Sequence, residues 1–236
     1  MTRSHQDIAA SSSLPAIPEY LEKVYWWAYL HPAAVRFFER QWLVNLILWG
    51  NYRCLRDATL AVLGLRIGGR VLQLACVYGD FSQQLARRLD VGARLDIIDV
   101  APVQLDNLQR KLGDDQRIYL ARQDASALSF PDVSFDSTLL FFLLHEQPAG
   151  VRRATLAEAL RVTRPGGRIV IVDYHRPRMA HPLRFLMHAV LRLLEPYAHD
   201  LWENEVADYL PAAYVPGRLE KTCYFGNLYQ RVVITV

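Results

Sequence analysis

The sequence predicts an α/β fold built around a doubly wound, Rossmann-like sheet of seven strands. From about residue 65 onward, short apolar runs alternate with helical patterns, as in parallel strands joined by right-handed helical crossovers. Near the carboxyl end the alternation stops, and two β-rich runs follow each other around Gly226 and Asn227, which indicates a hairpin. We therefore expect five parallel strands and a closing antiparallel hairpin, preceded by N-terminal helices.

The expected elements divide the chain into three parts. Residues 1–13 are expected to be a disordered tail, residues 14–54 to form aromatic helices broken at Pro32, and residues 55–236 to form the main domain. Within this domain the strands are expected at 71–75, 94–98, 117–121, inside 135–144 and at 168–172, the helices at 81–89, 101–112 and 149–163, and the hairpin strands at 219–224 and 229–236.

Composition excludes several classes of protein. The chain is 52% hydrophobic and 22% charged with a net charge of +3, which fits a globular protein and is too mild to indicate nucleic acid binding. Its three cysteines, Cys54, Cys76 and Cys223, match neither a disulfide framework nor a zinc spacing. The N-terminus lacks a secretory signal, and no apolar run is long enough to span a membrane. A reducing cytosol is the expected location.

Two acidic residues follow strands where ligands of such sheets bind, outside the carboxyl ends of the strands. Asp99 ends the second strand, 20 residues after Gly79, where its carboxylate can accept hydrogen bonds from ribose hydroxyls. Asp124 follows the third strand. The alternative for each residue is that it caps the adjoining helix or turn.

Residues 160–173, a helix ending in Arg-Pro-Gly-Gly before an apolar strand, resemble the late motif of class I S-adenosylmethionine (SAM)-dependent methyltransferases. Residues 130–136 support this resemblance, which covers residues 55–236. In the first motif Gln73 replaces the family's acidic residue, Ala75 and Val77 replace two glycines, and only Gly79 remains. The pattern Gly-x-Gly-x-x-Gly of nicotinamide-binding proteins is absent. The resemblance implies SAM binding by Gln73, Ala75, Val77, Tyr78, Gly79, Asp99, Val100, Asp124 and Ala125.

A closer resemblance is to the bacterial rhodoquinone-biosynthesis family. It lies in the loop 73–80, in the aromatic helices and in the Phe-Phe-Leu-Leu-His-Glu stretch 141–146. This resemblance implies conversion of ubiquinone to rhodoquinone, in which SAM donates an amino group that replaces a ring methoxy group, with a divalent metal, preferably manganese. Gln73 fits that chemistry, because loss of a carboxylate lowers the pKa of a neighbouring ammonium group and leaves more free amine.

The same resemblance suggests catalytic and metal-binding residues. Tyr78 and His145 are the catalytic candidates, and His145, Glu146, Asp173 and His175 are candidate manganese ligands after the fourth and fifth strands. The alternatives are that His145 and Glu146 only line a substrate cavity, that Asp173 caps a turn and that Tyr78 is a steric wedge.

A ubiquinone substrate would require contact with a membrane surface. Residues 20–49 carry four of the five tryptophans, and residues 183–194 are apolar with flanking arginines, so both segments suit the bilayer interface. Either segment could instead be a lid over a soluble pocket. We expect a peripheral protein on the cytoplasmic side of the inner membrane. Two other functions stay open: a conventional SAM-dependent methyltransferase acting on a quinone or another small lipophilic molecule, and a SAM-binding module without catalysis.

Overall fold

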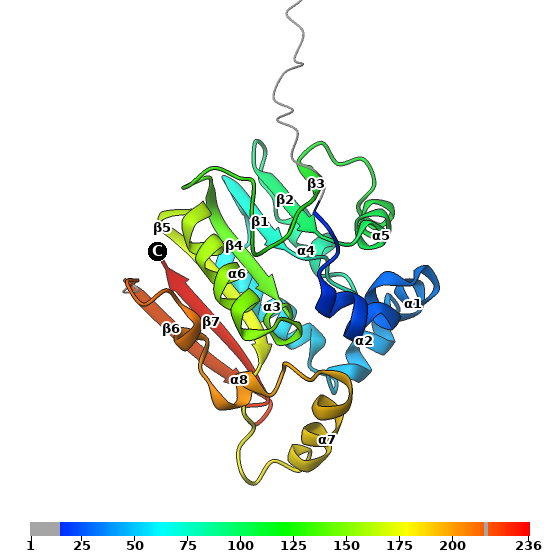
Figure 1. Ribbon diagram of the computed structural model, residues 1–236. Helices are drawn as coiled ribbons and strands as arrows, with labels where there is room; N and C mark the ends of the chain where they lie inside the picture. The colour runs from blue at the N-terminus through cyan, green and yellow to red at the C-terminus, as the bar shows by residue number, and fades with distance from the viewer. Residues whose placement is uncertain (1–14, 215–216) are drawn as a thin grey trace, which may run out of the picture.

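The computed structural model describes residues 15–214 and 217–236, so the predicted tail 1–13 lies outside the described residues. The central sheet has the order β3-β2-β1-β4-β5-β7-β6, in which the first five strands are parallel and β7 runs antiparallel to both neighbours (Figure 1). The predicted fold class is confirmed. The strands are β1 (Arg70–Leu74), β2 (Arg94–Asp99), β3 (Ile118–Arg122), β4 (Phe135–Phe141), β5 (Thr163–Tyr174), β6 (Arg218–Tyr224) and β7 (Tyr229–Thr235).

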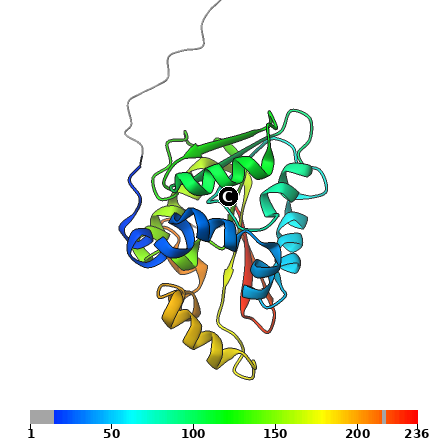
Figure 2. The same ribbon diagram turned by 90° about the vertical axis from the view of Figure 1, so that its right-hand side faces the viewer.

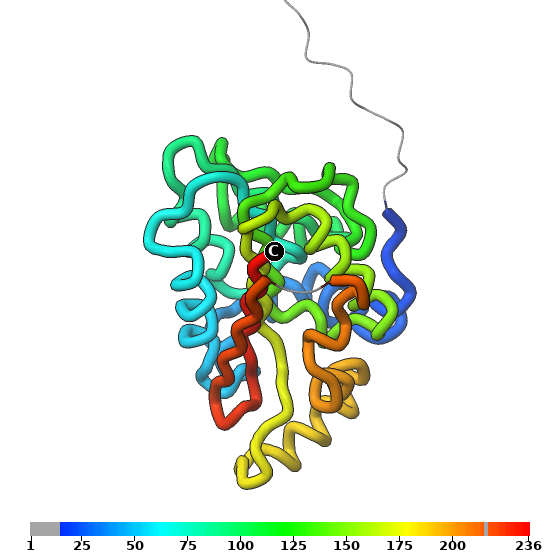
Figure 3. The backbone as a smooth tube through the Cα atoms, turned by 90° about the vertical axis from the view of Figure 1, so that its left-hand side faces the viewer, coloured from blue at the N-terminus to red at the C-terminus, as the bar shows by residue number. Residues whose placement is uncertain are grey.

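Helices cover both faces of the sheet because neighbouring strand residues point to opposite sides. On β1, Val71 packs in one core cluster with Phe81, whereas Leu72 packs in the other with Leu156. Figure 2 shows the two layers on either side of the sheet, and in Figure 3 the hairpin of β6 and β7 forms the near edge. The helices are α3 (Tyr52–Leu63), α4 (Phe81–Arg87), α5 (Pro102–Leu112), η2 (Leu144–Glu146), α6 (Ala149–Val162), α7 (Arg184–Leu194), α8 (Asp200–Glu203) and η3 (Val206–Tyr209).

The junction between α6 and β5 differs from the expected turn at residues 165–167. The helix ends at Val162 and β5 begins at Thr163, running through the Pro-Gly-Gly segment. Proline disfavours helical geometry at the residue before it, so the helix has to end ahead of Arg164. Gly167 is required there, because a Cβ atom would lie 2.7 Å from the Arg164 carbonyl oxygen and 2.9 Å from that of Asp136.

The N-terminal segment forms three helices where two were expected: η1 (Leu21–Leu30), a wide π-type helix, α1 (Pro32–Phe38) and α2 (Gln41–Ile47). Pro32 starts α1, and the His31 imidazole Nδ1 accepts a hydrogen bond from the Ala33 amide at 3.2 Å. The extra break falls at Arg40, whose backbone is extended. Across residues 15–214 and 217–236, no helix has both the length and the apolar character to cross a membrane.

Candidate active site

A cleft lies at the carboxyl ends of β1, β2 and β3, and Asp99 is its central polar group. The Asp99 carboxylate accepts hydrogen bonds from the Cys76 and Ala101 amides, both at 2.8 Å. Burial raises the pKa of Asp99 above its usual value. These backbone bonds fix the carboxylate beside the β1–α4 loop, where the sequence predicted a ribose-binding group.

The rest of the cleft is also polar. Asp124 Oδ1 accepts hydrogen bonds from the Ser126 amide at 2.8 Å and hydroxyl at 2.7 Å, so it caps a turn while facing the cleft. The buried Oε1 of Gln147 lines the cleft and has no hydrogen-bond partner among the described residues. Together these acceptors fit the hydroxyl and amino groups of a nucleoside. Of the predicted cofactor residues, the cleft is lined by Ala75, Asp99, Val100, Asp124 and Ala125.

The β1–α4 loop contains a left-handed backbone conformation even though alanine stands at a position where the resemblance to methyltransferases predicts glycine. Ala75 has φ of 69°, a left-handed conformation that glycine adopts more readily. Gly79 has φ of 83°, and a Cβ atom there would lie 2.6 Å from the Tyr52 hydroxyl. Gln73 is fully buried; its Nε2 donates to the Ala75 carbonyl at 2.9 Å and its Oε1 accepts from the Ser82 hydroxyl at 3.0 Å. Gln73 therefore stabilises the loop from inside.

Tyr78 binds the N-terminal helices and does not line the cleft. Its hydroxyl donates to the Ala28 carbonyl at 2.7 Å and accepts from Gln104 Nε2 at 2.8 Å, and its ring stacks on Tyr29 with centroids 5.8 Å apart. Val77 and Tyr78 line a second, apolar cavity instead. The large side chains of the altered loop thus hold the covering helices in place.

Glu39 makes a second connection between the helices and the loop. Its carboxylate accepts hydrogen bonds from the Gly79 amide at 3.1 Å and from Asn107 Nδ2 at 2.7 Å, and it pairs with Lys111. With η1 seated in this way, Tyr20, Leu21 and Tyr29 line the cleft, which keeps a cavity of only about 60 Å³. This cavity is smaller than a nucleoside, so η1 closes the cleft in this state.

A larger cavity of about 530 Å³ adjoins the cleft and is mostly apolar. Its walls come from η1, α1, α2, α7 and the ends of β4 and β5. It shares four lining residues with the cleft: Tyr29, Cys76, Phe142 and Glu146. Phe142 has φ of 56°, a strained backbone for a bulky side chain at the point where the two spaces meet.

A buried cluster of one histidine and three carboxylates lies at the inner end of this cavity. His145 Nδ1 is 3.0 Å from Asp173 Oδ1, and His145 Nε2 is 3.8 Å from Glu146 Oε1 and 4.0 Å from Glu195 Oε2. Asp173 is fully buried, and its Oδ2 also accepts hydrogen bonds from the Leu144 and His145 amides, at 2.8 and 3.2 Å. The carboxylate therefore positions both the backbone and the ring of His145.

The cluster changes the protonation of its members. Burial lowers the pKa of His145, but the charges of Asp173, Glu195 and Glu146 outweigh burial and raise this pKa to about 9. Burial raises the pKa of Glu146 to about 8 and also raises that of Glu195. At neutral pH, His145 and Glu146 therefore both hold protons. A histidine–carboxylate cluster in this state can exchange protons with a molecule in the apolar cavity.

Arg152 holds the short helix that carries His145 and Glu146. It is fully buried, its Nε donates to the Leu144 carbonyl at 2.9 Å, and its Nη2 donates to the carbonyls of Gln147 and Tyr197 at 2.9 and 3.0 Å. These three bonds connect α6 to the short helix η2 and to the segment before α8, so Arg152 holds η2 against its surroundings.

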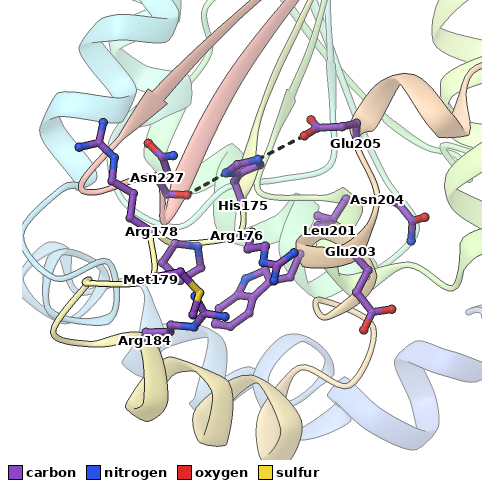
Figure 4. A pocket seen from close by; sticks show the side chains of 12 residues that line it. His175, Arg176, Arg178, Met179, Arg184, Leu201, Glu203, Asn204, Glu205 and Asn227 are labelled. Carbon is purple, nitrogen blue, oxygen red and sulfur yellow. Dashed lines mark hydrogen bonds and ion pairs between the residues drawn. The ribbon is translucent and has the colours of Figure 1, made fainter.

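Three of the four predicted metal ligands come together, and the fourth lies elsewhere. His145, Glu146 and Asp173 share the cluster, whereas His175 contacts the Asn227 carbonyl at 3.0 Å and Glu205 at 3.5 Å in a separate hollow (Figure 4). Within the part of the chain that the structure describes, no group of three or more His, Cys, Asp or Glu side chains is arranged to hold a metal ion. The manganese prediction is therefore unsupported.

Sequence reasoning missed Glu39, Arg152 and Glu195. Glu39 directly follows α1 and Arg152 lies inside α6, both among ordinary surface-type patterns, and nothing in their neighbours distinguishes them. Glu195 could have been noticed as the one acidic residue directly after the apolar stretch 183–194. Its contact with His145, however, depends on how α7 folds back over the sheet.

The comparison with protein families agrees with the geometry of the cleft. Residues 71–167, from β1 to the Pro-Gly-Gly segment, match the model described as a methyltransferase domain. The predicted class I methyltransferase fold is thus confirmed, and the matched region includes Asp99, Asp124 and the His145–Glu146 pair.

Two curated relatives are quinone methyltransferases by name. The demethylmenaquinone methyltransferase of Beutenbergia cavernae is 37% identical over 168 residues, which cover 70% of this chain and 66% of that protein. The ubiquinone/menaquinone biosynthesis C-methyltransferase UbiE of Coxiella burnetii is 30% identical over 168 residues, with the same coverage. The chain spans 52–66% of the length of the first curated relatives it matches.

Solved structures share the fold at low sequence identity. The N-methyltransferase NodS of Bradyrhizobium japonicum superposes with a TM-score of 0.57 at 18% identity, covering 77% of this chain and 94% of NodS. Human N-acetylserotonin methyltransferase superposes with a TM-score of 0.61 at 14% identity, covering 92% and 62% of the two chains. At these sequence identities, the structural similarity shows a shared fold and nothing about activity.

The predicted amino transfer to ubiquinone is wrong. The relatives that match this methyltransferase domain are named as quinone methyltransferases, which contradicts replacement of a methoxy group by the nitrogen of SAM. The prediction relied on the altered loop, and the structure shows another use for its residues. Gln73 is bonded inside the loop, and Tyr78 is bonded to the N-terminal helix.

Proposed function

We propose that this chain is a SAM-dependent methyltransferase that adds a methyl group to a ring carbon of a lipophilic quinol. The observation that carries this proposal is the junction of the polar cleft around Asp99 with the 530 Å³ apolar cavity at Tyr29, Cys76, Phe142 and Glu146. The names of the curated relatives support a quinone-related substrate.

In this proposal the cleft holds the cofactor. Asp99 accepts hydrogen bonds from the ribose hydroxyls, with Val100 beside it, and Asp124 and Ala125 contact the adenine. Ala75 and Cys76 lie along the methionine part, with Gln73 and Gly79 supporting the loop from behind. Bound SAM supplies an electrophilic methyl group. The cleft keeps the cofactor at the cavity junction, and closure of η1 excludes water from it.

The apolar cavity holds the quinol ring, and the buried cluster moves protons. A quinol carbon becomes nucleophilic when a ring hydroxyl loses its proton. Because His145 holds a proton at neutral pH, it accepts the quinol proton only in the fraction of molecules in which its imidazole is neutral, and this fraction grows as the pH rises towards 9. Asp173 orients the imidazole and stabilises its charged form. Once the ring carbon has bound the methyl group, it loses its own proton to solvent or to the cluster, which restores the aromatic ring. Tyr78 and Val77 contact the ring as part of the cavity wall.

Quinols of this class carry isoprenoid chains, so we also propose that the protein works at a membrane surface, on its cytoplasmic side. The apolar cavity accommodates the ring and the first part of such a chain, while the rest stays among lipids.

The test is turnover of a demethylmenaquinol with a short side chain by purified protein and SAM under reducing conditions. We expect equal amounts of S-adenosylhomocysteine and C-methylated quinol. His145→Gln should lower the rate about 100-fold, because general base catalysis contributes on this order. His175→Gln, which changes a histidine outside the cluster, should leave the rate nearly unchanged. No S-adenosylhomocysteine from any quinol, with SAM bound, would overturn the proposal.

A further inference from the structure

Helix α7 is apolar on both of its faces. Met187 and Leu191 are buried against the domain, whereas Phe185 and Leu193 on the opposite face are 84% and 81% exposed. An amphipathic helix of a globular protein normally carries polar residues on its outer face. The outer face of α7 therefore exposes large apolar side chains to water, which is unfavourable unless another apolar surface covers them.

Helix α2 lies beside α7 and shows the same anomaly. Trp49, just after α2, donates a hydrogen bond from its indole nitrogen to the sulfur of Met187 at 3.1 Å, which joins the two segments. Figure 1 shows α2 and α7 at the same end of the molecule. Together they present one apolar surface, which we call the docking surface; its exposed members are Trp42, Leu46, Ile47, Trp49, Phe185, Leu186, Leu193 and Leu194.

The charge around the docking surface is positive. Neither α2 nor α7 contains an aspartate or glutamate. Arg176, Arg184 and Arg192 form no ion pair within the described part of the chain, and Figure 4 shows Arg176 and Arg184 at the same hollow beside α7. Two acidic residues line that hollow, and one of them, Glu205, is paired with Lys221. Glu203 is then the one remaining acidic residue that lines the hollow beside Arg176 and Arg184, so positive charge exceeds negative charge there.

The docking surface adjoins the apolar cavity, because the two share lining residues. Leu46, Ile47, Trp49 and Leu194 are exposed and also line the 530 Å³ cavity. An apolar molecule that leaves this cavity therefore meets apolar side chains, which continue to the outer face of α7. Tryptophans at the rim and arginines around it are the side chains that prefer the headgroup level of a bilayer.

We propose that the docking surface inserts into the outer layer of an anionic lipid bilayer and that the lipophilic substrate passes directly from the bilayer into the cavity. Phe185 and Leu193 enter the acyl region, and Arg184 and Arg192 contact lipid phosphates. The substrate route rests on the proposed function, whereas the lipid contact rests on the docking surface alone. At 11 residues, α7 lies along the surface and does not span it.

The experiment is flotation of the full chain with vesicles of phosphatidylcholine, with or without phosphatidylglycerol. We expect the chain to bind the anionic vesicles and Phe185→Ser/Leu193→Ser to bind at least about tenfold more weakly, because two large apolar side chains no longer leave water. Arg184→Gln/Arg192→Gln should lose about tenfold on anionic vesicles and little on neutral ones. The matched control is Leu65→Ser/Val91→Ser, which changes two equally exposed apolar residues near the amino ends of β1 and β2 and should bind normally.

Turnover separates this proposal from the proposed function. With a short-chain quinol in solution, the Phe185→Ser/Leu193→Ser variant should match the unchanged protein, whereas with a long-chain quinol in vesicles it should be about tenfold slower. Normal vesicle binding by that variant, or failure of the unchanged protein to bind either vesicle, would overturn the lipid assignment; the second result would assign the surface to a protein partner. Vesicle binding without turnover of any quinol would overturn only the proposed function and the substrate route.

Discussion

The carboxyl ends of β1 and β2 and those of β4 and β5 adjoin each other, but they are built in different ways. At β1 and β2, Asp99 is held by the amides of Cys76 and Ala101, all within two short segments of the chain. At β4 and β5, His145 is surrounded by carboxylates from η2, β5 and the end of α7. The cofactor side depends on local backbone geometry, and the substrate side depends on long-range packing.

From this difference we expect the two sides to tolerate substitutions differently. The loop after β1 has lost two expected glycines and still presents Asp99, because Ala75 adopts the left-handed backbone and Gln73 bonds the loop from inside. The cluster around His145 has no such local support. It relies on Arg152 and Asp173, both fully buried, to hold η2 in place.

The largest effect is expected at Arg152, which tests whether the substrate side depends on packing. Arg152→Met should lower the free energy of unfolding by about 4 kcal/mol, because it removes a fully buried charged group together with its three buried hydrogen bonds to backbone carbonyls. Urea unfolding measures this effect. Arg153→Met, which changes the exposed neighbour, should cost less than about 1 kcal/mol, and equal losses for the two variants would contradict the assignment.

The next effect concerns the cofactor side. Asp99→Ala should weaken SAM binding about 100-fold, or about 2.7 kcal/mol, since charge-assisted hydrogen bonds to the ribose are lost. Isothermal titration calorimetry is the measurement, and Asp115→Asn at the amino end of β3 is the control. Unchanged affinity in the Asp99 variant would show that the nucleoside binds elsewhere.

The pH dependence of stability tests the cluster. The folded state raises the pKa of His145 from 6.5 to about 9 and that of Glu146 from 4.5 to about 8, so it holds both protons more tightly than the unfolded chain. The stabilisation by His145 is complete below pH 6.5 and is lost as pH rises through about 9. The contribution of Glu146 is lost between pH 4.5 and about 8.

Stability should therefore fall between pH 6.5 and 8, by up to about 1.4 kcal/mol per pH unit for each group. Glu146→Gln should reduce that slope in urea unfolding at a series of pH values. A stability that rises over this range in the unchanged protein, with no effect of the substitution on the slope, would contradict the protonation states assigned here.

The smallest effect is expected where the two sides meet the N-terminal helices. Tyr78→Phe removes the hydrogen bond to the Ala28 carbonyl, so opening of η1 should become easier by about 1 kcal/mol. Hydrogen exchange of the η1 amides should then be about fivefold faster. Tyr119→Phe on the exposed face of β3 is the control, and equal exchange in the two variants would separate Tyr78 from the closure of η1.

The sequence predicted the sheet and the cofactor side because both depend on short-range patterns. Alternating strands and helices, the Pro-Gly-Gly segment and the spacing from Gly79 to Asp99 are all visible in the chain. It also placed His145, Glu146 and Asp173 near one another, since each follows a neighbouring parallel strand. The sequence also grouped His175 with these residues. His175 lies two residues after Asp173, but its side chain lines a separate hollow beside Asn227.

The rest could not be read from the chain. Glu195 joins the cluster only because α7 folds over the ends of the strands, and Glu39 reaches the β1–α4 loop only because α1 lies beside α5. The hydrogen bond of Tyr78 to the Ala28 carbonyl could not be read from the sequence for the same reason. A tyrosine in a cofactor loop faces either the ligand or a covering helix, and tertiary contacts decide which.

The most direct test of the account follows the methyl group itself. Purified protein is incubated with SAM carrying a carbon-13 methyl group and a demethylmenaquinol, and the quinol is examined by mass spectrometry and NMR. The account predicts the label on a ring carbon, with the same amount of S-adenosylhomocysteine. Consumption of SAM without label in the quinol would contradict the claim that the cleft and the apolar cavity together form a methyl-transfer site.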